Sequence, residues 1–390
     1  MDLFIMTMQM KIAVLMSHDT RNYKLGGEIF AENLSYELRE IGNEVHIFRG
    51  FSSRNESFDS KGVYVHNHSQ VNFPFIGSYF ALRKMMKSIK EEEVPGKFDW
   101  IIMIGGGTAI VSSKLKSRNL AFFIIDTAMN EYRAVQKQLP SISFAAVKMN
   151  LFFKAISIGE KRGVKYSKFV ICITHSQIEE IRNLYNIDHK KILFVPLGLP
   201  DLWYGEQVNQ GSDIPTLINF IYFGAGKRRN IDLFLDCLRD LKEDGFSVSG
   251  TVVRANEEEI LKLRSMPDLD MQFYNNIGHE SLVRLYSSSL ALVIPSYREG
   301  FCIPVIEAAS QSVPTIASDL PQLHDLIINN ETGILIDNYL PENWVNAMRK
   351  LIIDKSFLGK LKIGAREMAD KFRLRKIAAE LNRSLKEELE

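Results

Sequence analysis

The chain has 390 residues, of which 46% are hydrophobic and 24% are charged, a composition typical of a soluble globular protein with room for two domains. Its 48 Lys and Arg almost balance its 47 Asp and Glu, and no nucleic-acid partner is expected. The three cysteines, Cys172, Cys237 and Cys302, are far apart and form no Cys-x-x-Cys pair, which excludes a disulfide framework and a cysteine zinc site.

The charges are unevenly distributed along the chain. Basic residues exceed acidic ones over residues 1–200, most strongly over 101–170, whereas acidic residues prevail afterwards. A basic patch in one domain suggests an anionic partner, such as a phosphorylated substrate or an anionic membrane surface, and a solvated lysine-rich face is an equally good interpretation. The stretches 73–90 and 144–168 mix aromatic and basic residues. They could lie on lipid, but we favour core-facing helices.

The N-terminus lacks the features of a signal peptide. No basic segment precedes its apolar residues, no small-residue cleavage pattern follows them, and no apolar run has membrane-spanning length. We therefore expect a cytoplasmic protein, whose only membrane association would be peripheral contact at the inner face of the cell membrane.

Short apolar runs alternate with amphipathic stretches from the start of the chain, as in parallel βαβ units. The alternation breaks around 196–201, and the segment 205–215 is polar with Gly and Pro. We interpret this part of the chain as a linker between domains. The chain is expected to be helical after Pro341. The predicted strands are 12–16, 44–48, 63–66, 100–104, 120–124, 169–173 and 192–195 before the linker, and 217–223, 248–253, 271–274, 290–294, 315–317 and 334–336 after it.

This pattern predicts an α/β protein with two Rossmann-like, doubly wound parallel-sheet domains in series. We expect the two domains to face each other across a cleft. Ligands of open α/β sheets bind beyond the carboxyl ends of the strands. The turns that follow strands are therefore the places to look for functional residues.

The densest signal is the segment 294–308, where a buried strand runs into a loop and a helix opens near Pro304. The amides from Gly300 to Ile303 would lie at the positive N-terminal end of that helix, which is a ready phosphate site. Glu299 and Glu307 flank this site and could accept hydrogen bonds from sugar and ribose hydroxyls. Taken alone, the two glutamates could be a loop charge and a partner of the helix dipole, but the whole strand–loop–helix string favours a binding site.

A second candidate phosphate element is the turn 223–232, which contains Gly224, Lys227, Arg228 and Arg229. The basic residues follow a buried strand and precede a helix, which places positive charge at the expected cleft. The alternative is a solvated basic turn, which is common.

The segment 294–308 resembles the Glu-x7-Glu motif of the retaining GT-B glycosyltransferases of family four. The likeness continues through 311–319 and 330–335, and upstream through 277–286, 195–198 and Leu25-Gly26-Gly27. It spans most of the chain and is strongest over 277–337. It implies the GT-B fold and metal-independent transfer of a hexose, with retention, from a nucleotide-diphosphate sugar to an acceptor hydroxyl.

The resemblance also implies roles for individual residues. Glu307 would bind the ribose. Glu299 would face the donor sugar and is a candidate catalytic residue. The other donor-binding residues implied are Gly300, Phe301, Cys302 and Ile303 at the helix N-terminus, Ile277 and Gly278 beside the base, Gly224 in the basic turn, and Gly26 and Gly27 closing over the phosphates.

The chain departs from the family pattern at two functional positions. Ala225 stands where the family has Arg, and Lys227 would replace that missing Arg. Arg229 best matches the Lys that the family has a few residues later. Asp126 stands near the family's His and becomes a candidate catalytic group, with a helix-capping aspartate as the alternative. These departures motivate a second hypothesis, a non-catalytic nucleotide-sugar-binding subunit. A third is a peripheral membrane interaction protein that uses the basic first domain.

The domain and partner predictions follow from the same likeness. Residues 1–200 would bind the acceptor, residues 201–370 the nucleotide sugar, and a helix at 371–390 would pack back toward the first domain. The acceptor would be a glycan, a lipid-linked molecule or a small molecule. No cofactor and no metal site are expected, since Asp268-Leu269-Asp270 has no neighbouring ligands and is interpreted as a surface turn.

Overall fold

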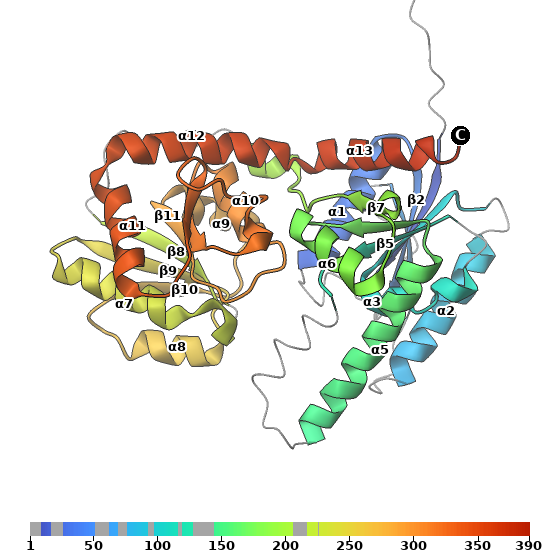
Figure 1. Ribbon diagram of the computed structural model, residues 1–390, viewed down its shortest axis with the longest axis horizontal. Helices are drawn as coiled ribbons and strands as arrows, with labels where there is room; N and C mark the ends of the chain where they lie inside the picture. The colour runs from blue at the N-terminus through green and yellow to red at the C-terminus, as the bar shows by residue number, and fades with distance from the viewer. Residues whose placement is uncertain are drawn as a thin grey trace, which may run out of the picture. The chain divides into compact units, whose positions relative to one another are not determined.

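The chain divides into two compact units, which are described separately (Figure 1). Unit 1 comprises Met1–Leu197 with Leu374–Glu390, and unit 2 comprises Gly198–Arg373. The computed structural model describes residues 9–16, 26–50, 62–68, 76–92, 97–115, 119–127, 144–205, 217–224 and 226–390. Within these ranges, no helix is both long enough and apolar enough to cross a membrane. The predicted linker at 205–215 lies almost entirely outside them.

Unit 1 contains a sheet of seven parallel strands in the order β3-β2-β1-β4-β5-β6-β7. The order reverses beside β1, as in a doubly wound Rossmann-like sheet. The strands are β1 (Lys11–Met16), β2 (Glu44–Gly50), β3 (Tyr64–His68), β4 (Trp100–Ile104), β5 (Leu120–Ile124), β6 (Phe169–Cys172) and β7 (Ile192–Phe194).

Helices cover both faces of this sheet, so its central strands β4 and β5 are apolar at every position. Successive side chains of a strand point to opposite faces. Phe122 of β5 packs in a cluster with Val164 and Ile181, whereas Phe123 contacts Phe30 with ring centroids 5.5 Å apart. The helices of unit 1 are α1 (Gly26–Glu40), α2 (Ile76–Glu92), α3 (Gly105–Ala109), α5 (Phe144–Tyr166), α6 (His175–Tyr185) and α13 (Leu374–Glu387).

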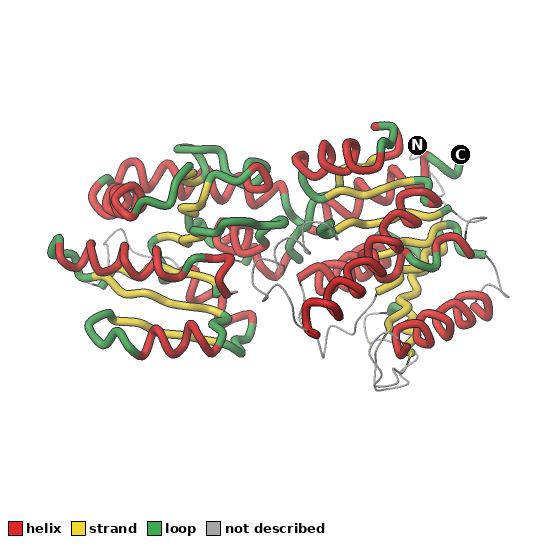
Figure 2. Tube along the Cα trace, turned by 60° about the horizontal axis from the view of Figure 1, so that its bottom comes forward, coloured by secondary structure: helices red, strands yellow, loops and turns green. Residues whose placement is uncertain are grey.

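Unit 2 contains a second parallel sheet, with six strands in the order β10-β9-β8-β11-β12-β13. Figure 2 draws the strands in yellow and the helices beside them in red. Its strands are β8 (Ile218–Phe223), β9 (Val248–Val253), β10 (Asp270–Tyr274), β11 (Ala291–Ile294), β12 (Thr315–Ser318) and β13 (Gly333–Ile336). Its helices are α7 (Ile231–Glu243), α8 (Glu257–Arg264), α9 (His279–Ser287), α10 (Ile303–Ser310), α11 (Pro341–Ile353) and α12 (Lys355–Lys371).

The predicted doubly wound α/β fold is confirmed. Every strand range predicted from the sequence overlaps one strand of the described structure. The stretches 73–90 and 144–168, for which we favoured core-facing helices, coincide largely with α2 and α5. The helical end of the chain is divided into α11, α12 and α13.

Helix α13 belongs to unit 1 although it follows unit 2 in the chain. The indole of Trp100 on β4 donates a hydrogen bond to the carbonyl of Leu385 at 3.0 Å. The side-chain amide of Asn43 donates one to Asn382 Oδ1 at 2.9 Å. Leu381 and Leu385 are buried on the same face of the helix. Unit 1 therefore needs the last residues of the chain to complete its core.

We expect Leu381→Ala to destabilise unit 1 by about 2–5 kcal/mol, because the substitution leaves a cavity beneath α13. Faster amide hydrogen exchange in β1 and β4, with unchanged exchange in β8 and β11, would report this loss. Arg383→Ala, an exposed position on the same helix, is the matched control. Equal exchange in the two variants would show that α13 is not part of the core of unit 1.

Candidate functional site

The helix N-terminus expected near residue 304 is formed by α10 in unit 2. Strand β11 ends at Ile294, and Cys302 precedes the helix in a left-handed conformation with φ 66°. Pro304 occupies the first turn, where its missing N–H costs nothing. The amide of Val305 donates to the carbonyl of Cys302 at 2.9 Å and closes that turn. The left-handed residue thus turns the chain from a loop directly into the helix.

The amides that open α10 have no protein acceptor among the residues described. No hydrogen bond from the amides of Phe301, Cys302 or Ile303 is present there, and the Cys302 side chain does not cap the helix. The first amides of a helix carry its positive dipole end and attract anions. This end of α10 is therefore chemically suited to phosphate, with Gly300 half-buried beside it.

Glu299 lies in the loop before α10 and is held by a network of polar contacts. Its side chain is only 2% exposed, and its Oε1 lies 2.9 Å from Arg229 Nε. The hydroxyl of Ser296 donates to the same oxygen at 2.8 Å, and Arg228 Nη1 lies 3.4 Å from Oε2. Arg229 also donates to the carbonyl of Phe223 at 3.2 Å. The pair joins the turn after β8 to the loop after β11.

This pairing differs from the separate roles expected for the two residues. Arg229 was predicted to face the leaving phosphate and Glu299 the donor sugar, and the structure brings them together as a buried ion pair. Burial alone would lower the pKa of Arg229, but the charge of Glu299 outweighs it and raises that pKa. Arg229 is therefore a fixed positive charge inside unit 2.

Glu307 lies on α10, half-buried, and accepts a hydrogen bond from the hydroxyl of Tyr286 at 2.8 Å. Tyr286 is fully buried on α9, and its ring stacks against Phe223 with centroids 5.8 Å apart. Burial raises the pKa of Glu307, and the Tyr286 hydrogen bond and the charges of Arg254 and Arg229 oppose that rise. The sequence did not single out Tyr286. Its place eight residues after Gly278, in the segment matched to the family, was the available signal.

Arg254 is a second residue that the sequence did not indicate. It follows β9 with φ 60°, its amide donates to the carbonyl of Tyr274 at 2.7 Å, and its side chain is exposed. Gly224, predicted to bind the donor, lies against this segment. A Cβ at Gly224 would be 2.6 Å from Glu259 Oε2 and 2.8 Å from the Arg254 carbonyl. The close approach of these two segments therefore requires glycine at position 224, whatever ligand binds.

The remaining predicted residues of unit 2 lie at turns after strands. Gly278 is the exposed N-cap of α9 and Ile277, half-buried, precedes it. Lys227 lies in the 3₁₀ turn Gly226–Arg229, but its side chain and the whole of Ala225 fall outside the described residues.

In unit 1 the predicted residues gather at the carboxyl end of β5. Gly26 and Gly27 begin α1, and a Cβ on Gly27 would lie 3.0 Å from the side chain of Ile125. The next residue, Asp126, is half-buried and accepts a hydrogen bond from the amide of Thr127 at 2.8 Å. The structure therefore brings Gly27 and Asp126 to the same edge of the sheet. The alternative role of Asp126 as a helix cap concerns residues 128–143, which lie outside the described structure.

Arg229→Met should destabilise unit 2 by about 3–5 kcal/mol, because it leaves the charge of Glu299 buried without its main partner. The double variant Arg229→Met/Glu299→Leu should recover most of that loss, since no charge is then buried. Urea unfolding combined with hydrogen exchange of β8 and β11 measures both. Arg228→Met, at a more exposed partner of Glu299, should cost no more than about 1 kcal/mol. Additive losses in the double variant would contradict the ion pair.

Comparison with known proteins bears first on unit 2. Residues 219–368 match the family described as "Glycosyl transferases group 1". The chain is 28% identical over 200 residues to the O-antigen chain mannosyltransferase RfbU of Salmonella typhimurium, an alignment that covers 49% of this chain and 53% of that protein. It is 30% identical over 242 residues to a D-inositol 3-phosphate glycosyltransferase of Rhodococcus opacus, covering 56% and 53%. The chain thus spans about half the length of these curated relatives.

Solved structures match almost the whole chain. A sucrose-phosphate synthase from Thermosynechococcus elongatus aligns with a TM-score of 0.79 at 18% identity, covering 98% of this chain and 99% of that one. Anabaena HepE in complex with UDP and glucose aligns with a TM-score of 0.72 at 13% identity, covering 97% and 100%. WaaG, a glycosyltransferase of lipopolysaccharide biosynthesis, aligns with a TM-score of 0.69 at 15% identity, covering 96% and 99%. The predicted resemblance is confirmed: residues 219–368 match the glycosyl transferases group 1, and the chain has the GT-B fold.

Proposed function

We propose that this protein is a glycosyltransferase that moves a hexose from a nucleotide-diphosphate sugar to an acceptor hydroxyl, with retention at the anomeric carbon and without a metal ion. The observation that carries the proposal is the open N-terminus of α10 between Glu299 and Glu307. An anion-binding helix end flanked by two acceptor carboxylates suits a pyrophosphate with a sugar on one side and a ribose on the other. UDP bound to the structurally similar HepE supports a nucleoside diphosphate as the ligand.

The residues of unit 2 supply the electrostatics of such a transfer. The amides of Phe301 to Ile303 would hold the pyrophosphate, and Glu307 would accept hydrogen bonds from the ribose. Negative charge builds on the leaving phosphate in the transition state, and positive groups fixed beforehand stabilise it without rearrangement. The buried Arg229, held in place by Glu299, is such a group. Arg228 and Lys227 in the same turn would add positive charge, so the chemistry needs no metal ion.

Unit 1 would provide the acceptor side of the reaction. Gly26 and Gly27 open α1 beside Asp126 at the carboxyl end of β5, the edge of a doubly wound sheet where ligands bind. We propose that Asp126 orients the reacting sugar or the acceptor hydroxyl. The names of the relatives, an O-antigen chain mannosyltransferase and D-inositol 3-phosphate glycosyltransferases, support a glycan or small-molecule acceptor. The basic excess of residues 1–200 supports peripheral contact with an anionic membrane on the cytoplasmic side.

The departures at Ala225 and Asp126 keep a non-catalytic nucleotide-sugar-binding subunit as the second candidate. Such a subunit would bind the donor through the same α10 site. It would not release nucleoside diphosphate with any acceptor, including those of its own cell extract.

Glu307→Gln should weaken nucleoside diphosphate binding about 10- to 100-fold, because hydrogen bonds to a charged acceptor contribute about 1.5–3 kcal/mol. Isothermal titration with UDP, GDP and ADP, followed by release assays with the matching sugars, measures binding and turnover. Glu331→Gln, an exposed position of unit 2, is the matched control. Equal affinities in both variants would exclude this site. Donor binding without turnover would select the non-catalytic alternative.

Nucleotide affinity should also fall as the pH is lowered, starting above the pH range in which an ordinary glutamate titrates. The raised pKa of Glu307 means that its carboxylate, the proposed hydrogen-bond acceptor for the ribose hydroxyls, becomes protonated at a higher pH. Tyr286→Phe removes a hydrogen bond that stabilises the carboxylate. It should therefore shift the loss of affinity to still higher pH. Glu307→Gln removes this titration and leaves only that of the nucleotide phosphate. The same midpoint in wild type and Tyr286→Phe would contradict the assigned contact.

A further inference from the structure

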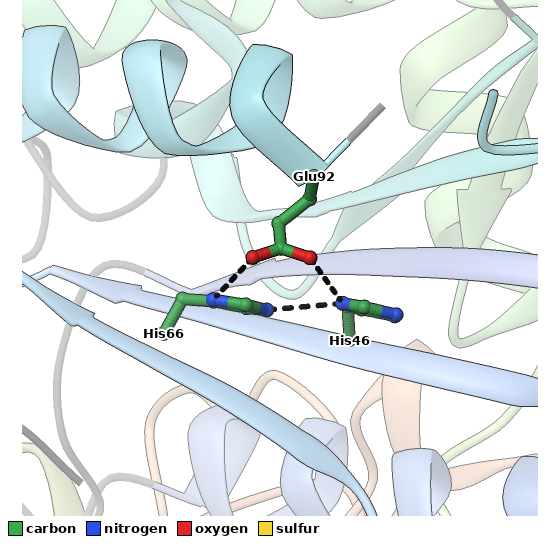
Figure 3. Close-up of side chains that lie close together, drawn as sticks. All are labelled: His46, His66 and Glu92. Carbon is green, nitrogen blue, oxygen red and sulfur yellow. Dashed lines mark hydrogen bonds and ion pairs between the residues drawn. The ribbon is translucent and has the colours of Figure 1, made fainter. Parts of the chain in front are cut away.

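A cluster of metal-ligating side chains lies in unit 1, on the strands β2 and β3. His46 and His66 lie side by side on these strands with their rings only 2° from parallel, and Glu92, the last residue of α2, points its carboxylate at both (Figure 3). His46 Nδ1 lies 3.0 Å from His66 Nε2 and 3.9 Å from Glu92 Oε2, and His66 Nδ1 lies 3.7 Å from Glu92 Oε1. Their side chains are 3%, 15% and 35% exposed.

A carboxylate next to the cluster determines which nitrogen of His46 is free. Glu44 Oε1 lies 2.8 Å from His46 Nε2 and 3.3 Å from Lys11 Nζ. A carboxylate accepts hydrogen bonds, and Glu44 Oε1 lies within reach of donors on both His46 and Lys11. His46 therefore carries its proton on Nε2 and presents the lone pair of Nδ1 to His66 and Glu92. A carboxylate that orients a histidine in this way is the usual outer partner of a histidine metal ligand.

Either tautomer of His66 leaves two atoms with lone pairs facing each other in the cluster. If His66 donates from Nε2 to His46, its bare Nδ1 faces the Glu92 carboxylate. If it carries the proton on Nδ1, its bare Nε2 faces the bare Nδ1 of His46 at 3.0 Å. In either case two lone pairs face each other, and a cation bound between them would remove their electrostatic repulsion.

We propose that His46, His66 and Glu92 form a binding site for a divalent transition-metal ion, with Zn²⁺ the best match. The ligands would be His46 Nδ1, one ring nitrogen of His66 and the Glu92 carboxylate, which lie within 4.8 Å of one another. In a tetrahedral zinc site, bonds of about 2.0–2.1 Å place the ligand atoms about 3.3 Å apart. The separations from His46 Nδ1, 3.0 Å to His66 Nε2 and 3.9 Å to Glu92 Oε2, lie on either side of that value. Two imidazoles and one carboxylate are a zinc ligand set, and water would fill the fourth position.

The place of the cluster in the sheet indicates a structural role. Lys11 and Glu44, the first residues of β1 and β2, are register partners, so the cluster lies toward the amino end of β2. Gly27 and Asp126 lie at the carboxyl end of the same sheet. A metal ion would tie the end of α2 to β2 and to the edge strand β3. This site is separate from the proposed donor site in unit 2, whose chemistry stays metal-independent.

The experiment uses the full-length, untagged protein, stripped with a chelator and titrated with Co²⁺ and then Zn²⁺ near pH 7.5. We expect one equivalent of Co²⁺ to produce the visible absorption of a four-coordinate ion, Zn²⁺ to displace it, and either metal to raise the melting temperature. Lys11 should limit the affinity to the micromolar range, because its charge repels a dication. His66→Gln and Glu92→Gln should each weaken binding at least tenfold.

Two matched controls address nonspecific binding and misfolding. Glu91→Gln, beside Glu92 on α2, and His189→Gln, an exposed histidine of unit 1, should bind metal as the wild type does. Circular dichroism checks that each variant is folded, and the exposed Glu92 carboxylate can be changed with little risk to the fold. Absence of one-equivalent binding, or binding unaffected by both His66→Gln and Glu92→Gln, would overturn the proposal. Nucleotide binding in the same samples keeps this outcome separate from that of the proposed transferase function.

Discussion

The buried ion pair between Arg229 and Glu299 is the interaction on which the candidate site of unit 2 depends. It connects the turn after β8 to the loop after β11, and the amide of Tyr297 donates to the carbonyl of Arg228 at 2.9 Å in support of the same junction. Burying two charges is unfavourable unless their geometry and remaining hydrogen bonds compensate. Here Ser296 and the carbonyl of Phe223 provide those bonds. The pair therefore positions the loop from which α10 presents its first amides.

Unit 1 shows how one sheet can carry two kinds of site. The carboxyl end of β5 gathers Gly27 and Asp126, at the edge where doubly wound sheets bind ligands. The amino end of β2 brings His46 next to His66 and beneath Glu92. The first arrangement follows from the general topology of parallel sheets, whereas the second depends on the side chains of this chain. The C-terminal helix α13 completes the core that supports both.

Much of this structure could be predicted from the sequence because parallel strands buried on both faces are continuous apolar runs. The run predicted at 100–104 is the strand β4 itself. The helix start near Pro304 could also be predicted, since proline and the preceding glycine loop act locally. The contacts between residues distant in the sequence could not be predicted. Tyr286 meets Glu307, and Arg229 meets Glu299, only because strands and helices bring together residues 21 and 70 positions apart. The same is true of His46 and His66, whose proximity depends on the register of β2 and β3.

The central claim is that the amides opening α10 bind a pyrophosphate, and amide NMR of the titrated protein tests it most directly. On addition of a nucleoside diphosphate, the resonances of Phe301, Cys302 and Ile303 should shift strongly at saturation, whereas the matching nucleoside without phosphate should leave them nearly unchanged. Diphosphate binding that leaves these three amides unshifted, or equal shifts with the bare nucleoside, would contradict the account.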